Sequence, residues 1–209
     1  MSGSAGGDRV AGVEHRRAAG VTDVVGAVLA GGAGSRLGGA KAGTLLAGRP
    51  LLSYPLSALR AVLPQVAVVA KDETDLASVG YGVLIWREPA APRHPLAGVV
   101  EALRRAEGRP VVVLACDLPF VTADLVRSLA SADAGGAPAV VATTAERGLQ
   151  PLCARYEPAA LAALADFDPD GRAVTQVQAL EPATIDVPDA VLRNVNTAAD
   201  LAAAEAALG

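Results

Sequence analysis

The chain is poor in aromatic residues, lysine and cysteine, and each shortage narrows what it can be. Aromatic residues make up 3% of the 209 residues, so the core must be built from Ala, Val and Leu rather than from rings. Only two of the 18 Lys and Arg residues are lysines, Lys41 and Lys71. The cysteines, Cys116 and Cys153, show neither a metal-ligand spacing nor a disulfide framework, and we expect both to be small core residues.

Further absences exclude function classes. The formal net charge is −4 and no basic run exceeds a few residues, which disfavours bulk binding of nucleic acid. No apolar stretch reaches the roughly 18 residues that a membrane-spanning helix needs. A secretory signal pattern is also missing, so we expect a protein of the cytoplasm, away from membranes.

The composition that remains is that of a packed globule. Hydrophobic residues make up 52% and charged residues 19%, too few charges for a disordered chain. Residues 1–22 are rich in Gly, Ala and Arg and lack apolar periodicity, which predicts a loose N-terminal tail. Residues 23–209 are expected to form one domain, the number that a chain of this length favours.

Apolar runs alternate with amphipathic segments along the first 130 residues. Strands are expected at 24–30, 66–70, 82–86, 111–115, 138–144, 151–156 and 184–187, and helices at 51–63, 95–106, 122–130, 157–166 and 197–208. This order predicts an α/β fold, a three-layer α/β/α sandwich around a mainly parallel, Rossmann-like sheet. In such sheets ligands bind beyond the carboxyl ends of the strands.

A glycine-rich loop follows the first expected strand, running from Gly31 to Gly43 and containing Ser35, Arg36 and Lys41. Glycines let successive N–H groups converge on an anion. Arg36 adds a fork of donors and Lys41 a mobile charge, so the loop suits a triphosphate. Its spacing fits neither a Walker P-loop nor a dinucleotide fingerprint. The alternative is a flexible turn with a solvated Arg and Lys.

Asp117 follows the valine-rich run 111–115 and precedes Leu-Pro-Phe. A half-desolvated carboxylate is costly without a cation, and Mg²⁺ prefers oxygen ligands while bridging phosphates. We interpret Asp117 as a Mg²⁺ ligand; the alternative is a turn or helix-capping carboxylate.

Asn194 and Asn196 are two residues apart in an extended segment, so both amides face one way. One of them completes the metal or phosphate shell, or both cap the last helix.

Three other polar or aromatic residues are interpreted as having no catalytic or binding role. His94, in a proline-rich loop, is interpreted as a surface imidazole rather than a catalytic base. Trp86 is expected to pack in the sheet, and Lys71 is interpreted as an ordinary residue at a strand end.

Together these motifs resemble the GT-A-like nucleotidyltransferases, and among them the molybdenum cofactor guanylyltransferase family. The resemblance covers about Val24 to the C-terminus and rests on Leu29–Lys41, Gly48–Leu52, Pro95–Val99, Cys116–Phe120, Gln150–Leu152 and Asn194–Thr197. It implies transfer of GMP from GTP to molybdopterin with release of pyrophosphate, Mg²⁺ as cofactor, and contacts with molybdenum cofactor biosynthesis proteins.

The resemblance also implies a set of site residues. The nucleotide would be bound by Leu29, Ala30, Gly31, Gly32, Ser35, Arg36, Lys41, Glu88, Gly98 and Asp117. Catalysis would rest on Arg36, Lys41 and Asp117, and the metal would be held by Asp117 and Asn196.

Two departures from the family pattern leave alternatives open. The segment before Lys41 is one residue shorter than usual and has no Asp directly before the lysine, a spacing also found in cytidylyltransferase relatives. The nearest carboxylate after the third expected strand is Glu88 rather than an Asp. The alternatives are a cytidylyltransferase that uses CTP with molybdopterin or another phosphorylated acceptor, and a non-catalytic nucleotide-binding regulator.

Overall fold

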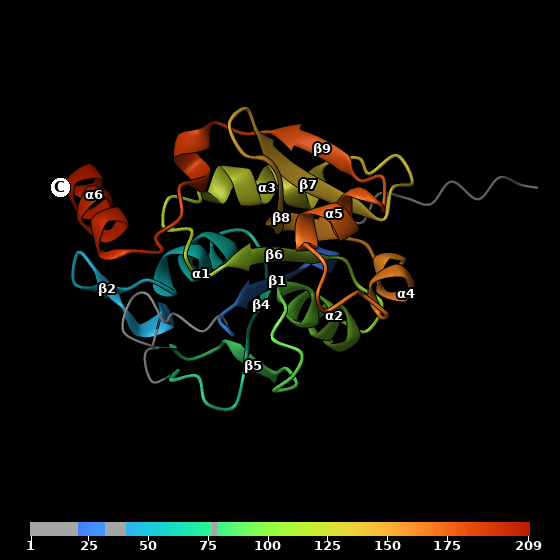
Figure 1. The fold of residues 1–209 in the computed structure, drawn as a ribbon, viewed down its shortest axis with the longest axis horizontal. Coiled ribbons are helices and arrows are strands. Elements are labelled where there is room, and N and C mark those ends of the chain that lie inside the picture. The colour runs from blue at the N-terminus through green and yellow to red at the C-terminus, as the bar shows by residue number, and fades with distance from the viewer. Residues whose placement is uncertain (1–20, 32–40, 77–78) are drawn as a thin grey trace, which may run out of the picture.

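The computed structural model describes residues 21–31, 41–76 and 79–209. A seven-stranded sheet with the order β5-β4-β1-β6-β8-β7-β9 forms its centre, with helices on both faces (Figure 1). The strands are β1 (Val25–Leu29), β4 (Gln65–Ala70), β5 (Leu84–Arg87), β6 (Val111–Ala115), β7 (Ala139–Thr144), β8 (Gly148–Tyr156) and β9 (Ala183–Asp186). The expected α/β fold with a mainly parallel sheet is confirmed.

One strand reverses the direction of the sheet. β5, β4, β1 and β6 are mutually parallel, β8 is antiparallel to both β6 and β7, and β9 is parallel to β7. Only residues 145–147 connect β7 to β8, and a connection that short makes a hairpin, whereas a parallel pair needs a long crossover. The sequence pattern located both strands but not their opposite directions.

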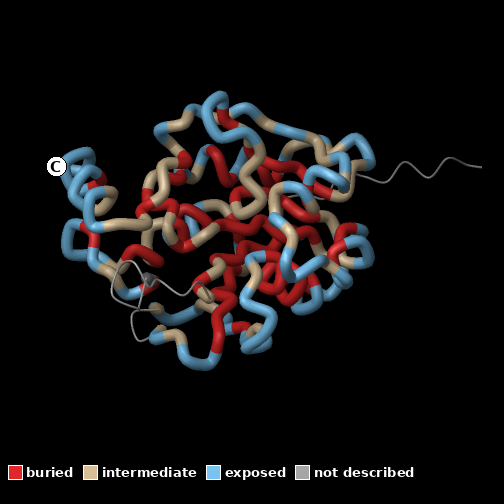
Figure 2. Tube along the Cα trace, in the orientation of Figure 1, coloured by how far each residue is buried: buried red, intermediate tan, exposed pale blue. Residues whose placement is uncertain are grey.

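Two hydrophobic layers separate the sheet from the helices. α1 (Ser53–Arg60) and α3 (Ala123–Ser131) cover one face, and α2 (Pro95–Arg105), α4 (Ala160–Leu164) and α5 (Ala173–Gln178) cover the other. Successive residues of a strand point to opposite faces, so Val28 packs in the first layer and Ala27 in the second. Buried segments therefore run through the middle of the molecule, as Figure 2 shows.

A smaller unit lies beside the main sheet. The hairpin of β2 (Leu45–Leu46) and β3 (Arg49–Pro50) packs with α6 (Ala198–Leu208) through Leu46, Leu51, Val195 and Ala204. Thr197 and Asp200 form the capping box that opens α6, as its sequence predicts. The single-turn helices η1 (Val21–Asp23), η3 (Lys41–Gly43) and η4 (Asp189–Leu192) complete the described elements.

Several expectations need adjustment. The helix expected at 157–166 is reduced to Ala160–Leu164, and α5 lies where no helix was expected. Trp86 packs in the sheet and both cysteines are buried, as predicted. Most of the predicted tail, residues 1–20, lies outside the described residues. Within the described ranges, no helix has the length and apolar character needed to cross a membrane.

Candidate active site

Four strand ends meet at one edge of the sheet. Gly31 follows β1, Lys71 follows β4, Glu88 follows β5 and Asp117 follows β6. Because these strands are parallel, their carboxyl ends lie at the same edge. A cavity of about 320 Å³ opens there, and all four residues line it, together with Gly98 at the start of α2. The cavity is at the position where open α/β sheets bind ligands.

Asp117 lies between this cavity and a smaller one. The second cavity, of about 170 Å³, is lined by Asp117, Gln150 and Asn194 among others. Its lining includes Gln150–Cys153 of β8, whereas the larger cavity is lined by residues that follow β1, β4 and β5. The carbonyl of Asp117 accepts a hydrogen bond of 2.9 Å from the Val195 N–H, which ties this strand end to the segment before α6. Asp117 is half-buried and lines both cavities.

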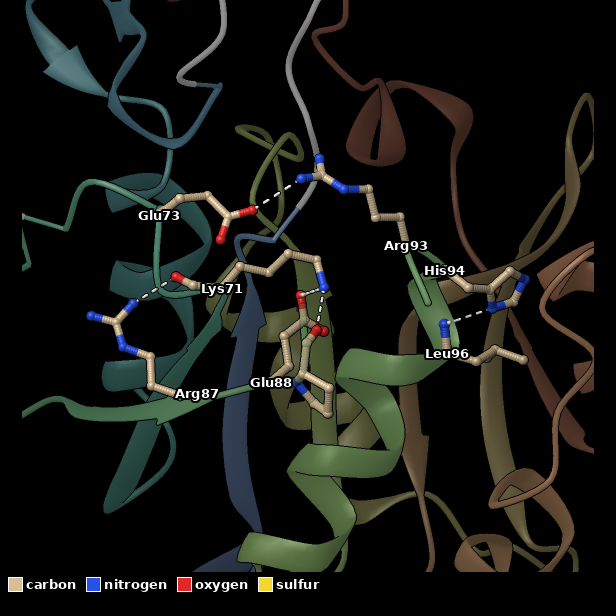
Figure 3. Close-up of polar contacts among 8 residues, drawn as sticks. Lys71, Glu73, Arg87, Glu88, Arg93, His94 and Leu96 are labelled. Carbon is tan, nitrogen blue, oxygen red and sulfur yellow. Dashed lines mark hydrogen bonds and ion pairs between the residues drawn. The ribbon is translucent and has the colours of Figure 1, made fainter. Parts of the chain in front are cut away.

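Lys71 and Glu88 form a buried ion pair in the larger cavity (Figure 3). The Lys71 Nζ lies 3.4 Å from Glu88 Oε1, and the two side chains are only 4% and 7% exposed. Nζ also donates a hydrogen bond of 2.6 Å to the carbonyl of Pro89. Burial raises the pKa of the Glu88 carboxyl above its ordinary value, and the Lys71 charge works against that rise.

The Glu88 carboxylate occupies the space beside two glycines. A Cβ at Gly31 would lie 1.8 Å from Glu88 Oε1, and a Cβ at Gly98 would lie 3.1 Å from Oε2. A side chain at position 31 therefore cannot coexist with this position of Glu88. A side chain at position 31 would displace the end of the Glu88 side chain.

The residues before α2 close one side of the cavity. The Nδ1 atom of His94 accepts a hydrogen bond from the Leu96 N–H at 3.2 Å, which caps α2. Nε2 lies 2.9 Å from the Gly171 carbonyl, and since Nδ1 is the acceptor, Nε2 carries the proton and donates it. The ring also stacks on Phe167, with centroids 4.8 Å apart. The interpretation of His94 as a surface imidazole is wrong, because it is half-buried and both nitrogens are engaged.

The structure brings together about half of the predicted nucleotide site. Leu29, Gly31, Glu88, Gly98 and Asp117 line the larger cavity. Ala30 is buried, and its N–H donates to the Val69 carbonyl. Gly32, Ser35 and Arg36 lie outside the described residues, and of Lys41 only the backbone position, at the start of η3, is described.

Of the two predicted metal ligands, Asp117 and Asn196, one lines a cavity and the other does not. Asp117 lines both cavities, whereas Asn196 is not among the residues that line either of them. The N–H of Asn196 donates to Asp200 Oδ2 at 3.0 Å, while Asn194 lines the smaller cavity and accepts from Arg147 at 3.0 Å. In the described ranges no three His, Cys, Asp or Glu side chains cluster as a metal site. The roles of Asp117 and Asn196 as metal ligands stay predictions.

Lys71 is a charged residue of the larger cavity that the sequence interpretation missed. It is buried and paired inside the cavity, so its interpretation as an ordinary strand-end residue is wrong. Two signals in the sequence could have identified it: the scarcity of lysine, and its position directly after a strand of a parallel sheet, where ligands bind.

A cavity at the carboxyl edge of a mainly parallel sheet, with a carboxylate at one of its strand ends, is typical of α/β nucleotide-binding proteins. The profile of the family described as MobA-like NTP transferase domain matches residues 26–183. The chain belongs to this family and is a nucleotidyltransferase.

Named relatives agree with this assignment. The chain is 33% identical over 179 residues to a probable molybdenum cofactor guanylyltransferase of Deinococcus radiodurans, covering 84% of this chain and 91% of the relative. It is 32% identical over 117 residues to a probable molybdenum cofactor guanylyltransferase of Methanocaldococcus jannaschii, covering 53% of this chain and 57% of that one. The chain thus spans just over half the length of the second relative.

A solved structure agrees with the fold. Molybdopterin-guanine dinucleotide biosynthesis protein A from Archaeoglobus fulgidus superposes with a TM-score of 0.70 at 25% identity, covering 88% of this chain and 98% of that one. The expected resemblance to the molybdenum cofactor guanylyltransferase family is confirmed at the level of family and fold.

Proposed function

We propose that this protein transfers GMP from GTP to molybdopterin and releases pyrophosphate, with Mg²⁺ as cofactor. The observation that carries the proposal is the position of Asp117 between two cavities at the carboxyl edge of the sheet. An in-line displacement needs the leaving group and the attacking group on opposite sides of the α-phosphorus. Two cavities lined by the same Asp117 leave room for these two groups, and the family and its named relatives support the choice of substrates.

The larger cavity receives the nucleotide in this proposal. The triphosphate lies along the loop after β1, where Arg36 and Lys41 are the predicted cationic groups. Glu88 and Gly98 lie further along the edge of the sheet and line the part of the cavity left for the nucleoside. Positioning and neutralisation of charge contribute most of the catalysis of phosphoryl transfer.

The smaller cavity receives the phosphate end of the acceptor. Gln150 and Asn194 line it beside Asp117 and bring amide groups that can hydrogen bond to phosphate or pterin atoms. An acceptor phosphate is already ionised near neutral pH, so its oxygen attacks without a strong general base. This agrees with the engagement of both His94 nitrogens in structural hydrogen bonds.

The donor set at this edge fits Mg²⁺. Mg²⁺ binds through one or two carboxylates together with substrate phosphates and water, so Asp117 suffices as the main protein ligand. Asn196 remains the predicted second ligand. When bound, Mg²⁺ neutralises charge on the reacting phosphates.

The test is pyrophosphate release with GTP, CTP, ATP or UTP in the presence of molybdopterin and Mg²⁺. We expect release with GTP and formation of the guanine dinucleotide of molybdopterin. Release with CTP alone would establish the cytidylyltransferase alternative. Nucleotide binding without release for any acceptor would establish the non-catalytic regulator.

A further inference from the structure

Lys71 is a buried cation in the larger cavity. The proposed reaction assigns it no role. Its ammonium reaches the Pro89 carbonyl and the Glu88 carboxylate (Figure 3). Only 3% of the residue is exposed. Lysine is rarely buried unless it is paired, and removing one partner of a buried pair leaves a costly unpaired charge. The pair therefore calls for an explanation beyond packing.

The charge state of Glu88 depends on this lysine. Burial raises the pKa of the Glu88 carboxyl, and the negative charges of Glu101 and Glu73 raise it further. The charge and the hydrogen bond of Lys71 are what hold the pKa of Glu88 down. Arg93, His94 and Asp117 line the same cavity, but the guanidinium of Arg93 pairs with Glu73 at 3.2 Å. Without Lys71, Glu88 would hold its proton to higher pH.

Lys71 also determines where the carboxylate points. It engages Oε1, the oxygen that lies against Gly31, while Oε2 lies next to Gly98 at the first turns of α2. In the ranges that the structure describes, the ion pair of Glu88 is the one with Lys71. A carboxylate has acceptor sites on both oxygens, so Oε2 is placed to accept hydrogen bonds from a ligand in the cavity.

The position of Glu88 corresponds to the nucleoside end of the nucleotide. Neighbouring strands lie about 4.8 Å apart, and β5, which precedes Glu88, is three strands away from β6, which precedes Asp117. The larger cavity is lined at the ends of all four strands from β5 to β6, by Asp117, Gly31, Lys71 and Glu88, so a nucleotide with its α-phosphate at Asp117 has room for its nucleoside on the β4 and β5 side. This step rests on the proposed function.

We infer that Lys71 is a positioning residue of the nucleotide site, which keeps Glu88 ionised and oriented so that its carboxylate accepts hydrogen bonds from the nucleoside. The donors are the N–H groups of the base or the hydroxyl groups of the ribose. Hydrogen bonds to a charged acceptor are stronger than neutral ones, so the nucleotide benefits only while Glu88 is ionised.

The test measures the GTP dissociation constant of the full chain by titration calorimetry from about pH 6 to about pH 8.5. The variants are Lys71→Met, Glu88→Gln and the double variant. In Lys71→Met we expect binding about tenfold weaker than wild type at the acidic end. Much of the affinity should return at the alkaline end, where Glu88 loses its proton. Glu88→Gln should bind weakly at every pH, and the double variant should match it.

Arg155→Met is a matched control. Arg155 is a buried cation that pairs with Glu157 at 2.7 Å, and it lies toward the opposite edge of the sheet, because Arg155 faces Val112 near the start of β6. Arg155→Met should lower the melting temperature but leave the pH dependence of GTP binding as it is in wild type. The wild-type pH dependence includes the titration of the nucleotide itself, so the variants are compared with it rather than with a flat profile. A changed pH dependence in the control would overturn the specific role of Lys71.

Binding measurements with two GTP analogues identify which group of the nucleotide donates a hydrogen bond to Glu88. ITP lacks the 2-amino group of guanine and 2′-deoxy-GTP lacks one ribose hydroxyl, so the analogue that loses affinity in wild type but not in Glu88→Gln identifies the group bound. A Lys71→Met protein with wild-type affinity at all pH values would overturn the inference. If that variant does not fold, further weakening of the double variant relative to Glu88→Gln overturns it. Failure of the wild type to bind any nucleotide would instead refute the proposed function.

Discussion

Replacing Gly31 by alanine adds one Cβ atom beside Glu88 and so tests the position of this carboxylate in the larger cavity. The new Cβ would lie 1.8 Å from Glu88 Oε1, and contact between carbon and oxygen requires about 3.4 Å. The carboxylate must therefore move by about 1.6 Å, which disturbs the 3.4 Å ion pair of Oε1 with Lys71. We expect a loss of about 1 to 3 kcal/mol in the free energy of unfolding, together with GTP binding weakened about tenfold.

Urea denaturation and GTP titration measure these two effects. Gly80→Ala is the control, since among the described residues its Cβ meets only Arg60, at an ordinary 3.7 Å, and we expect little change in either quantity. Adding Glu88→Ala to Gly31→Ala removes the clash and should restore part of the stability without restoring affinity. Wild-type stability and wild-type affinity in Gly31→Ala would refute this account of the cavity.

Three further predictions concern catalysis, the metal and pH. Asp117→Ala and Lys41→Ala should each lower turnover at least about tenfold, with unchanged circular dichroism; full turnover in either variant would exclude its role. Chelation of Mg²⁺ should abolish pyrophosphate release, and added Mg²⁺ should restore it; release that survives chelation would contradict the cofactor assignment. Because the folded-state pKa of Glu88 is raised above 4.5, the folded state binds more protons than the unfolded state just above that pH. The stability of wild type relative to Glu88→Gln should therefore fall as pH rises from 4.5 to the raised pKa. Urea denaturation across this range measures the difference, and an opposite slope would show that Lys71 outweighs burial.

The layered fold could be predicted because its signals are local. The valine-rich runs that became β1, β4 and β6 have the length and composition of buried parallel strands, and Thr197 with Asp200 gives a cap that sequence alone identifies. The direction of β8 and the short helix α5 depend on a tight turn and on packing rather than on a periodic pattern. Local patterns carry little information about either.

Some residues of the site could also be predicted from local sequence, whereas others depend on tertiary contacts. Asp117 and Gly31 stand beside recognisable strands and could be predicted from their positions. The interaction of Lys71 with Glu88 joins residues 17 positions apart whose strands are neighbours only in the folded sheet. The engagement of His94 depends on Gly171, which is more distant still. These contacts follow from tertiary structure, so the residue types alone could not identify them.

The central claim is transfer of GMP to molybdopterin at Asp117. Its most direct test incubates wild type and Asp117→Ala with GTP, molybdopterin and Mg²⁺, and quantifies pyrophosphate and the dinucleotide product by mass spectrometry. We expect equal amounts of pyrophosphate and molybdopterin guanine dinucleotide from wild type, and at least about tenfold less of both from Asp117→Ala. A wild-type protein that binds GTP but forms no dinucleotide, or an Asp117→Ala variant as active as wild type, would contradict the claim.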